Sequence, residues 1–210
     1  MSSVHALNPP PGEPLIGFNH FQRQWFKKEQ CYSVKIKPGE YYVTREHEAI
    51  ITLLGSCISA CVCDPVTGIG GMNHFILPEN DRFQNLAQSE TARYGVFAME
   101  QLINEILKNG GQRHRLEAKI TGGGQMIPGM SDVGDQNIRF VKMFLQTEGI
   151  RLISQDVGGE YGRRVAYLPL QNRLLVKRMP TLHNSRLYVA ENKFRHQIEQ
   201  HNDGSDVELF

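Results

Sequence analysis

The chain has 210 residues and a formal net charge of +1, which gives no overall field that would attract nucleic acid or an anionic membrane. No apolar run is long enough to span a bilayer, and residues 1–13 lack the apolar stretch of a signal peptide. We therefore expect one compact domain in the cytoplasm, with its 4 cysteines reduced.

The first part of the chain predicts mostly strands. Residues 1–13 are polar and rich in proline, and we expect a flexible lead there. The aromatic segment 18–26 predicts a short helix docked on the core. Strands are expected at residues 32–36, 41–43 and 49–54, with Pro38-Gly39 as a turn, and then on both sides of a hairpin, at residues 58–63 and 69–77.

Helical stripes and further strands follow. We expect a polar loop over residues 80–88, helices over residues 90–109, 135–148 and 187–201, strands at 116–120, 150–157, 164–168 and 173–176, and a tail over 202–210. Strands around two long helices, without regular βαβ repetition, predict an α/β fold: a compact layered sandwich that contains a mixed sheet.

The hairpin holds a cysteine and a histidine on either side of a turn. Asp64-Pro65 followed by Gly68 is typical turn chemistry. If the loop runs from Asp64 to Thr67, Cys57 lies directly opposite His74 and on the same face, within reach of its imidazole. A slip of one residue would put the two groups on opposite faces. The pattern predicts a nucleophile and its base.

Simpler interpretations of these residues stay open. A buried cysteine is usually a small apolar residue, and a lone histidine is usually packed or solvated. Cys57, Cys61 and Cys63 share strand parity and could bind zinc, but no second cysteine pair is present. We expect neither a metal nor a cofactor.

Glycine clusters occur after two of the expected strands. Gly122-Gly123-Gly124 lacks the Lys-Ser/Thr ending of a phosphate loop. We expect instead that the backbone of another segment approaches it closely, and this contact could lie beside the active site. Gly158-Gly159 predicts a tight turn. Arg163 and Arg164 beyond it could hold a carboxylate, although a solvated ion pair is the default.

These motifs together resemble the CheD family of chemoreceptor glutamine deamidases. The resemblance runs from about Ile36 to Lys177. It rests on the segments Lys37-Pro38-Gly39-Glu40, Leu54-Gly55-Ser56-Cys57, Asp64-Pro65, Gly70 to Pro78, Arg93-Tyr94-Gly95, Gly122 to Met126, Asp156 to Gly159 and Gly162-Arg163-Arg164.

The resemblance implies a function. Members hydrolyse glutamine side chains in the cytoplasmic signalling helices of methyl-accepting chemoreceptors to glutamate and ammonia, which supports adaptation. Some members hydrolyse glutamyl methyl esters, and some pair with a CheC-type CheY-phosphate phosphatase. The implied fold is a layered α/β one, related to glutamine-deamidating toxins. A receptor methylesterase, or a non-catalytic adaptor that regulates such a phosphatase or a receptor array, is the alternative.

The resemblance also implies the roles of residues. Cys57 is the expected nucleophile, His74 the base, and Thr52 the residue that orients the imidazole. Thr52 lies one position closer to Cys57 than family patterns often place it, so Ser56, Asn73 or a backbone carbonyl stays an alternative. The amides around Gly55, Ser56 and Cys57 are candidates for an oxyanion hole, with Asn73 nearby.

The resemblance divides the chain into three units. We expect an N-terminal extension over residues 1–30, a CheD-like deamidase domain over 31–184, and a C-terminal helix and tail over 185–210.

Overall fold

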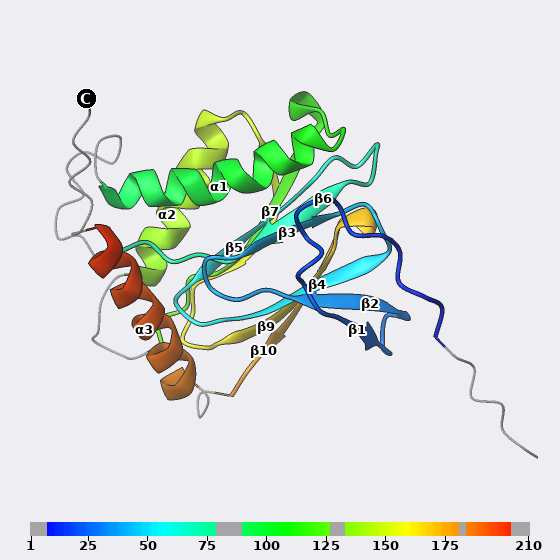
Figure 1. Cartoon of the computed structure of the whole chain (residues 1–210). Helices are drawn as coiled ribbons and strands as arrows, with labels where there is room; N and C mark the ends of the chain where they lie inside the picture. The colour runs from blue at the N-terminus through cyan, green and yellow to red at the C-terminus, as the bar shows by residue number, and fades with distance from the viewer. Residues whose placement is uncertain (1–7, 79–89, 127–132, 181–183, 203–210) are drawn as a thin grey trace, which may run out of the picture.

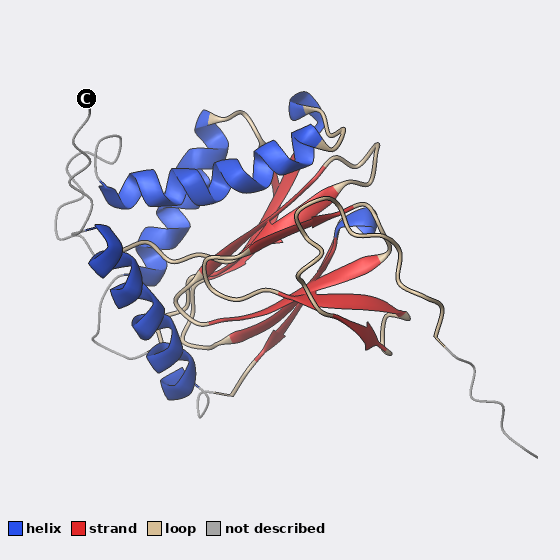
Figure 2. Ribbon diagram, in the orientation of Figure 1, coloured by secondary structure: helices blue, strands red, loops and turns tan. Residues whose placement is uncertain are grey.

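The computed structural model describes residues 8–78, 90–126, 133–180 and 184–202. Two five-stranded sheets stack face to face, and helices cover one of them (Figure 1, Figure 2). The core fills the space between the sheets and beneath the helices, and its fully buried members include Tyr42, Ile50, Ile58, Met72 and Tyr167. None of the helices in these residues combines the length and apolarity that a membrane crossing requires.

The first sheet has the strand order β1-β2-β4-β9-β10. Its strands are β1 (Arg23–Phe26), β2 (Cys31–Lys35), β4 (Glu48–Leu54), β9 (Arg163–Leu168) and β10 (Arg173–Arg178). β2 and β4 run parallel, and the other neighbours are antiparallel.

The second sheet has the order β3-β6-β5-β7-β8. It comprises β3 (Tyr41–Thr44), β6 (Gly70–Asn73), β5 (Ile58–Cys63), β7 (Glu117–Gly122) and β8 (Arg151–Val157). β7 and β8 are parallel, so both sheets are mixed. Every residue of β5 and β6 is buried, since this sheet lies between the helices and the first sheet.

Three α-helices complete the fold in the described residues. Helices α1 (Glu90–Lys108) and α2 (Val133–Thr147) lie across the second sheet, whereas α3 (Asn184–Asn202) stands at one side of the sandwich (Figure 1). α1 and α2 end just before glycines with positive φ, Gly110 (100°) and Gly149 (66°), as helices commonly do. Short 3₁₀ turns, η1 (Arg113–Arg115) and η2 (Pro169–Gln171), precede β7 and β10.

The predicted α/β sandwich is confirmed, with two mixed sheets rather than one. The helix expected in residues 18–26 is wrong: residues 23–26 form edge strand β1, and Phe18 packs on the core against Tyr42. Aromatic residues are enriched in strands, and the pairing with β2 draws this segment into the sheet. The loop expected over 80–88, and most of the lead and tail, lie outside the described residues. The division into three units stays a prediction.

The predicted hairpin is present, but its expected register is wrong. Cys63 pairs with Gly70 and Cys61 with Met72, and the bridge between Ile58 and Phe75 continues this alignment. Cys57 therefore lies across from Ile76 rather than His74. Because side chains alternate with a period of two, this shift of two positions keeps Cys57 and His74 on the same face.

Asp64 explains the shift. Its main-chain N–H donates to the Ile69 carbonyl, so Asp64 and Ile69 close the ladder and the turn lies beyond them. The carboxylate is fully buried and bound by Arg115, with the main-chain N–H groups of Val66, Thr67 and Gln112 nearby. Burial alone would raise the pKa of Asp64, but these donors outweigh it and lower the pKa from 3.8 to about 2.

Asp64→Asn should therefore destabilise the fold by about 2 kcal/mol at neutral pH. The carboxylate contributes stability above its unfolded pKa, and this contribution is lost as the pH falls from about 4 through about 2. Urea unfolding of both proteins at neutral and acidic pH measures the difference, which should shrink in acid. Glu100→Gln, at an exposed position of α1, is the matched control. An equal loss at both pH values would contradict the assignment.

Candidate active site

The site is built around the three residues that carry the chain from β4 of the first sheet to β5 of the second. The carbonyl of Gly55 accepts from the Gly124 N–H (2.7 Å), and that of Cys57 from the Gly123 N–H (2.7 Å). The Ser56 carbonyl accepts from the Asn137 side chain (2.9 Å). Each of the three carbonyls is thus held by a donor from elsewhere in the chain. The N–H groups of the same three residues converge on one acceptor, the carboxylate of Glu191.

The glycine cluster makes this contact possible, as its sequence predicted. Gly122 has a φ of 115°, and a Cβ there would lie 2.3 Å from the Cys57 carbonyl oxygen. Only a glycine backbone can approach Cys57 this closely.

Cys57 directly precedes β5 and is completely buried. Its sulfur, a ring nitrogen of His74 and a carboxylate oxygen of Glu191 all lie within 4.8 Å of one another. Burial raises the pKa of the Cys57 thiol well above its usual value, and the negative charge and hydrogen bond of Glu191 raise it further. The arrangement therefore holds Cys57 as a thiol.

His74 follows β6, and its main chain is fixed on both sides. Its carbonyl accepts from the Gly39 N–H (2.7 Å), and its N–H donates to the Glu40 carbonyl (2.9 Å). The segment Pro38-Gly39-Glu40, which carries part of the family resemblance, thus positions the imidazole. Burial lowers the pKa of His74 to about 3, so the ring is neutral.

Thr52 contacts His74 from the first sheet. Its Oγ1 lies 2.8 Å from His74 Nδ1 and 2.9 Å from the carbonyl oxygen of Ile36. The hydroxyl has one proton, which goes to the carbonyl because a carbonyl can only accept. Nδ1 must then carry the proton that Thr52 accepts, which leaves a lone pair on Nε2. Within the described residues, Nε2 is buried and has no hydrogen-bond partner.

The other residues predicted for the site lie in different places. Asn73 points away: its Oδ1 accepts from Ala60 N–H (2.8 Å) and its Nδ2 donates to the Ala98 carbonyl (3.1 Å). Ser56 Oγ donates to Glu191 (2.7 Å) rather than to His74. Of the candidates for orienting the imidazole, Thr52 is the one that touches it.

Two further residues of the site were missed from the sequence. Asn137, fully buried in α2, accepts from the Leu77 N–H (2.8 Å) and so joins the segment after His74 to the turn at Ser56. An asparagine inside the apolar stripe of a helix was the available signal. Glu191 of α3 is the second, and it too interrupts an apolar stripe, formed by Leu187, Phe194 and Ile198.

Glu191 fills the space beside Cys57. One carboxylate oxygen accepts from the N–H groups of Gly55 (2.7 Å) and Cys57 (3.3 Å). The other accepts from the N–H and hydroxyl of Ser56, both at 2.7 Å. The three converging N–H groups therefore form an anion-binding nest, hereafter the 55–57 nest, which is occupied by a carboxylate.

Cys57, His74 and Glu191 form the one cluster in the described residues whose ligand atoms could surround a metal ion. Cys61 and Cys63, which the sequence offered as zinc ligands, do not join it. The N–H groups that surround the Glu191 carboxylate present partial positive charge, which suits an anion and opposes a cation. The donor set fits a carboxylate or oxyanion better than a metal.

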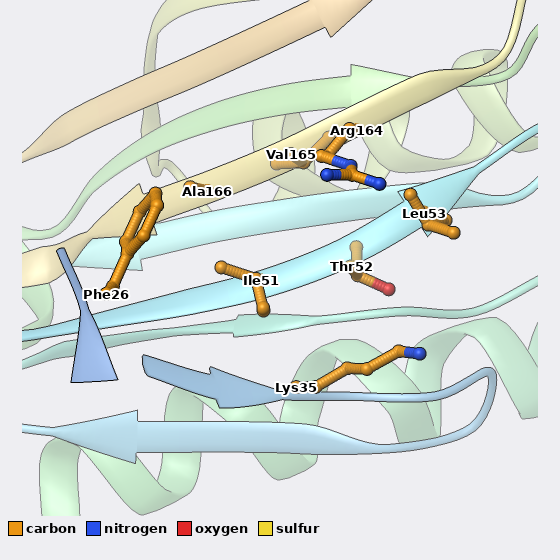
Figure 3. Close-up of a pocket in the computed structure, with 8 residues that line it drawn as sticks. All are labelled: Phe26, Lys35, Ile51, Thr52, Leu53, Arg164, Val165 and Ala166. Carbon is orange, nitrogen blue, oxygen red and sulfur yellow. The ribbon is translucent and has the colours of Figure 1, made fainter. Parts of the chain in front are cut away.

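Arg163 and Arg164 have different environments. The expectation of a solvated ion pair is wrong for Arg163, which is fully buried, donates to Asp156 (2.8 Å) and binds the Gly158 carbonyl (2.6 Å). Arg164 is exposed and lines a hollow of about 280 Å³ at β4 and β9 (Figure 3). Thr52 also lines this hollow, together with Phe26 and Ile51, but Cys57 and His74 do not, so the hollow does not reach the thiol.

The network predicts one tautomer of His74. Nitrogen chemical shifts of the imidazole should report a neutral ring protonated at Nδ1 between about pH 5 and 8, the range in which a histidine ordinarily titrates. Thr52→Val removes the acceptor and should mix the tautomers, whereas Thr52→Ser should preserve the signal. Titration of His74 within that range in the unaltered protein would contradict this assignment.

Comparisons with known proteins agree with the resemblance. A family model described as "CheD chemotactic sensory transduction" matches residues 76–178. A protein of Hahella chejuensis named "Probable chemoreceptor glutamine deamidase CheD" is 45% identical over 213 residues, covering 100% of both chains. Proteins of the same name from Halorhodospira halophila (45% identical, 93% of each chain) and Methylobacillus flagellatus (46%, covering 88% of this chain and 92% of the relative) are similar. The chain belongs to the CheD family.

Proposed function

We propose that this protein hydrolyses glutamine side chains of methyl-accepting chemoreceptors to glutamate and ammonia. The observation that carries the proposal is the group formed by Cys57, His74 and Thr52 beside the 55–57 nest. A nucleophile, an oriented base and preplaced N–H donors are the requirements of acyl transfer. The relatives' names, which identify probable chemoreceptor glutamine deamidases, support the substrate.

In the first half of the reaction, His74 Nε2 takes the Cys57 proton and the thiolate attacks the carboxamide carbon. The carbonyl oxygen becomes an oxyanion, which the N–H groups of Gly55 and Cys57 are placed to stabilise. Thr52 keeps the Nδ1 proton in place while the imidazolium forms. The C–N bond then breaks, the imidazolium protonates the departing nitrogen, and ammonia leaves behind a glutamyl thioester.

In the second half, neutral His74 removes a proton from water, and the resulting hydroxide attacks the thioester. The same N–H groups hold the oxyanion. The C–S bond breaks, the sulfur recovers its proton from His74, and glutamate is released. A glutamyl methyl ester would enter through the same thioester, with methanol as the leaving group.

Partners and location follow as further parts of the proposal. A substrate on cytoplasmic receptor helices would place the protein in the cytoplasm. The resemblance predicts a CheC-type CheY-phosphate phosphatase as a second partner in some bacteria. For an adaptor alone, a thiol paired with an oriented imidazole would have no use, so the geometry favours the enzyme.

Cys57→Ala and His74→Ala should each abolish turnover while the chain stays folded. A purified receptor cytoplasmic fragment, incubated with each protein, is analysed by mass spectrometry for glutamine converted to glutamate. Conversion with the unaltered protein alone supports the mechanism and identifies the sites. Unchanged rates in either variant would contradict it. No conversion by any of the proteins would favour the esterase or adaptor, and a methylated fragment then separates those two.

Thr52→Val should lower kcat by about a hundredfold, the scale of a general-base contribution, because the imidazole loses its tautomer and orientation. KM should change little, since Thr52 lies behind His74. Thr52→Ser, which retains the hydroxyl, should recover most of the rate. A large change in KM with constant kcat would argue that Thr52 acts on substrate binding.

A further inference from the structure

Helix α3 places one face against the site. Its residues Leu187, Glu191, Phe194 and Ile198 follow a helical spacing, and each packs inward. Leu187 packs at Gly162 and Phe194 packs on Gly39, where an added Cβ would lie 2.6 Å from either side chain. Between these apolar contacts, Glu191 enters the 55–57 nest. The opposite face, with Val189 (66% exposed) and Lys193, faces solvent.

The Glu191 side chain has the chemical structure of the reaction product. A glutamate released from a receptor helix would have to leave its carboxylate beside Cys57, in contact with the N–H groups that had held its oxyanion. Glu191 already makes these contacts: both oxygens are bound, at 2.7–3.3 Å, by Gly55, Ser56 and Cys57. It does so from a helix, the same element that presents the receptor glutamine.

Substrate and α3 cannot occupy the site together. Cys57 is 0% exposed and His74 is 2% exposed in this arrangement. A Cβ on Gly55 would lie 2.8 Å from Glu191, so the Glu191 carboxylate leaves no room for a substrate carboxamide in the nest. Burial and the Glu191 charge also favour the thiol over the thiolate. With α3 docked, Cys57 is therefore a buried thiol without access to substrate.

We propose that α3 is an intramolecular pseudosubstrate: it holds Glu191 in the product position, keeps Cys57 inaccessible, and is displaced by the receptor helix. This inference rests on the proposed function for the identity of the displacing helix. Deamidation then requires opening of α3, and any change that weakens the Glu191 contacts raises the fraction of active protein.

Glu191→Gln tests the position of the side chain without a receptor. A glutamine at this place is a carboxamide beside Cys57, and the enzyme should act on it in cis: ammonia leaves, and residue 191 becomes glutamate, or stays joined to Cys57 as a thioester where water does not enter. Mass spectrometry of the α3 peptide detects either product. The double variant Cys57→Ala with Glu191→Gln should keep its glutamine.

Glu191→Ala tests the inhibition. We expect deamidation of a receptor fragment, and alkylation of Cys57 by iodoacetamide, to rise about tenfold, which corresponds to about 1.4 kcal/mol of lost docking. Lys193→Ala, on the exposed face of the same helix, should leave both rates unchanged. Cys57→Ala shows which alkylation belongs to Cys57. Equal rates in the unaltered protein and Glu191→Ala would overturn the inhibitory role.

The outcomes separate the two proposals. If the glutamine introduced by Glu191→Gln stays intact in the full chain, while the unaltered protein deamidates receptors, the pseudosubstrate alone is overturned. Conversion of the introduced glutamine that depends on Cys57, with receptors left untouched, supports the pseudosubstrate and overturns the receptor as substrate. If neither the introduced glutamine nor a receptor glutamine is converted, both proposals fail.

Discussion

Hydrogen bonds to three consecutive carbonyls are the interaction on which the site depends. Gly55, Ser56 and Cys57 form a connection too short to fix its own orientation, and each of their carbonyls is held by a different donor. The donors come from the glycine segment after β7 and from α2. Within a trans peptide unit the N–H points opposite to the carbonyl before it, so holding the Gly55 and Ser56 carbonyls turns the Ser56 and Cys57 N–H groups the other way, toward the Glu191 carboxylate. An anion-binding nest is thus produced by the tertiary fold rather than by the local sequence.

The segments that carry the family resemblance support this arrangement more often than they react. Gly39 and Glu40 hold the main chain of His74, and Gly123 and Gly124 hold the turn at Cys57. Asn137, which lies outside those segments, joins the two. Arg163 fixes the turn at Gly158 from inside the fold. A displacement of a fraction of an ångström in the Cys57 thiol or the His74 imidazole would weaken acyl transfer. The residues that hold these two groups therefore need positions almost as precise as that of the thiol.

Much of the fold and part of the site could be predicted from the sequence. Strand alternation predicted that Cys57 and His74 lie on one face. This prediction holds although the expected register was wrong, because the register differs by two residues and side chains alternate with a period of two. The error itself came from Asp64, whose main-chain N–H pairs with Ile69 and whose carboxylate is bound by Arg115, a partner far along the chain. Asn137 and Glu191 were missed for a related reason: each is a polar residue in an apolar stripe, and only tertiary packing shows what it meets.

The contact between Thr52 and His74 crosses from one sheet to the other. Thr52 belongs to β4 and is anchored to Ile36 in the first sheet, while His74 follows β6 in the second, and 2.8 Å separates their polar atoms. An increase of about an ångström in this separation would take the two atoms beyond hydrogen-bond range. The orientation of His74 therefore depends on the alignment of the two sheets. Side chains packed between the sheets, far from any substrate, determine whether the base is oriented.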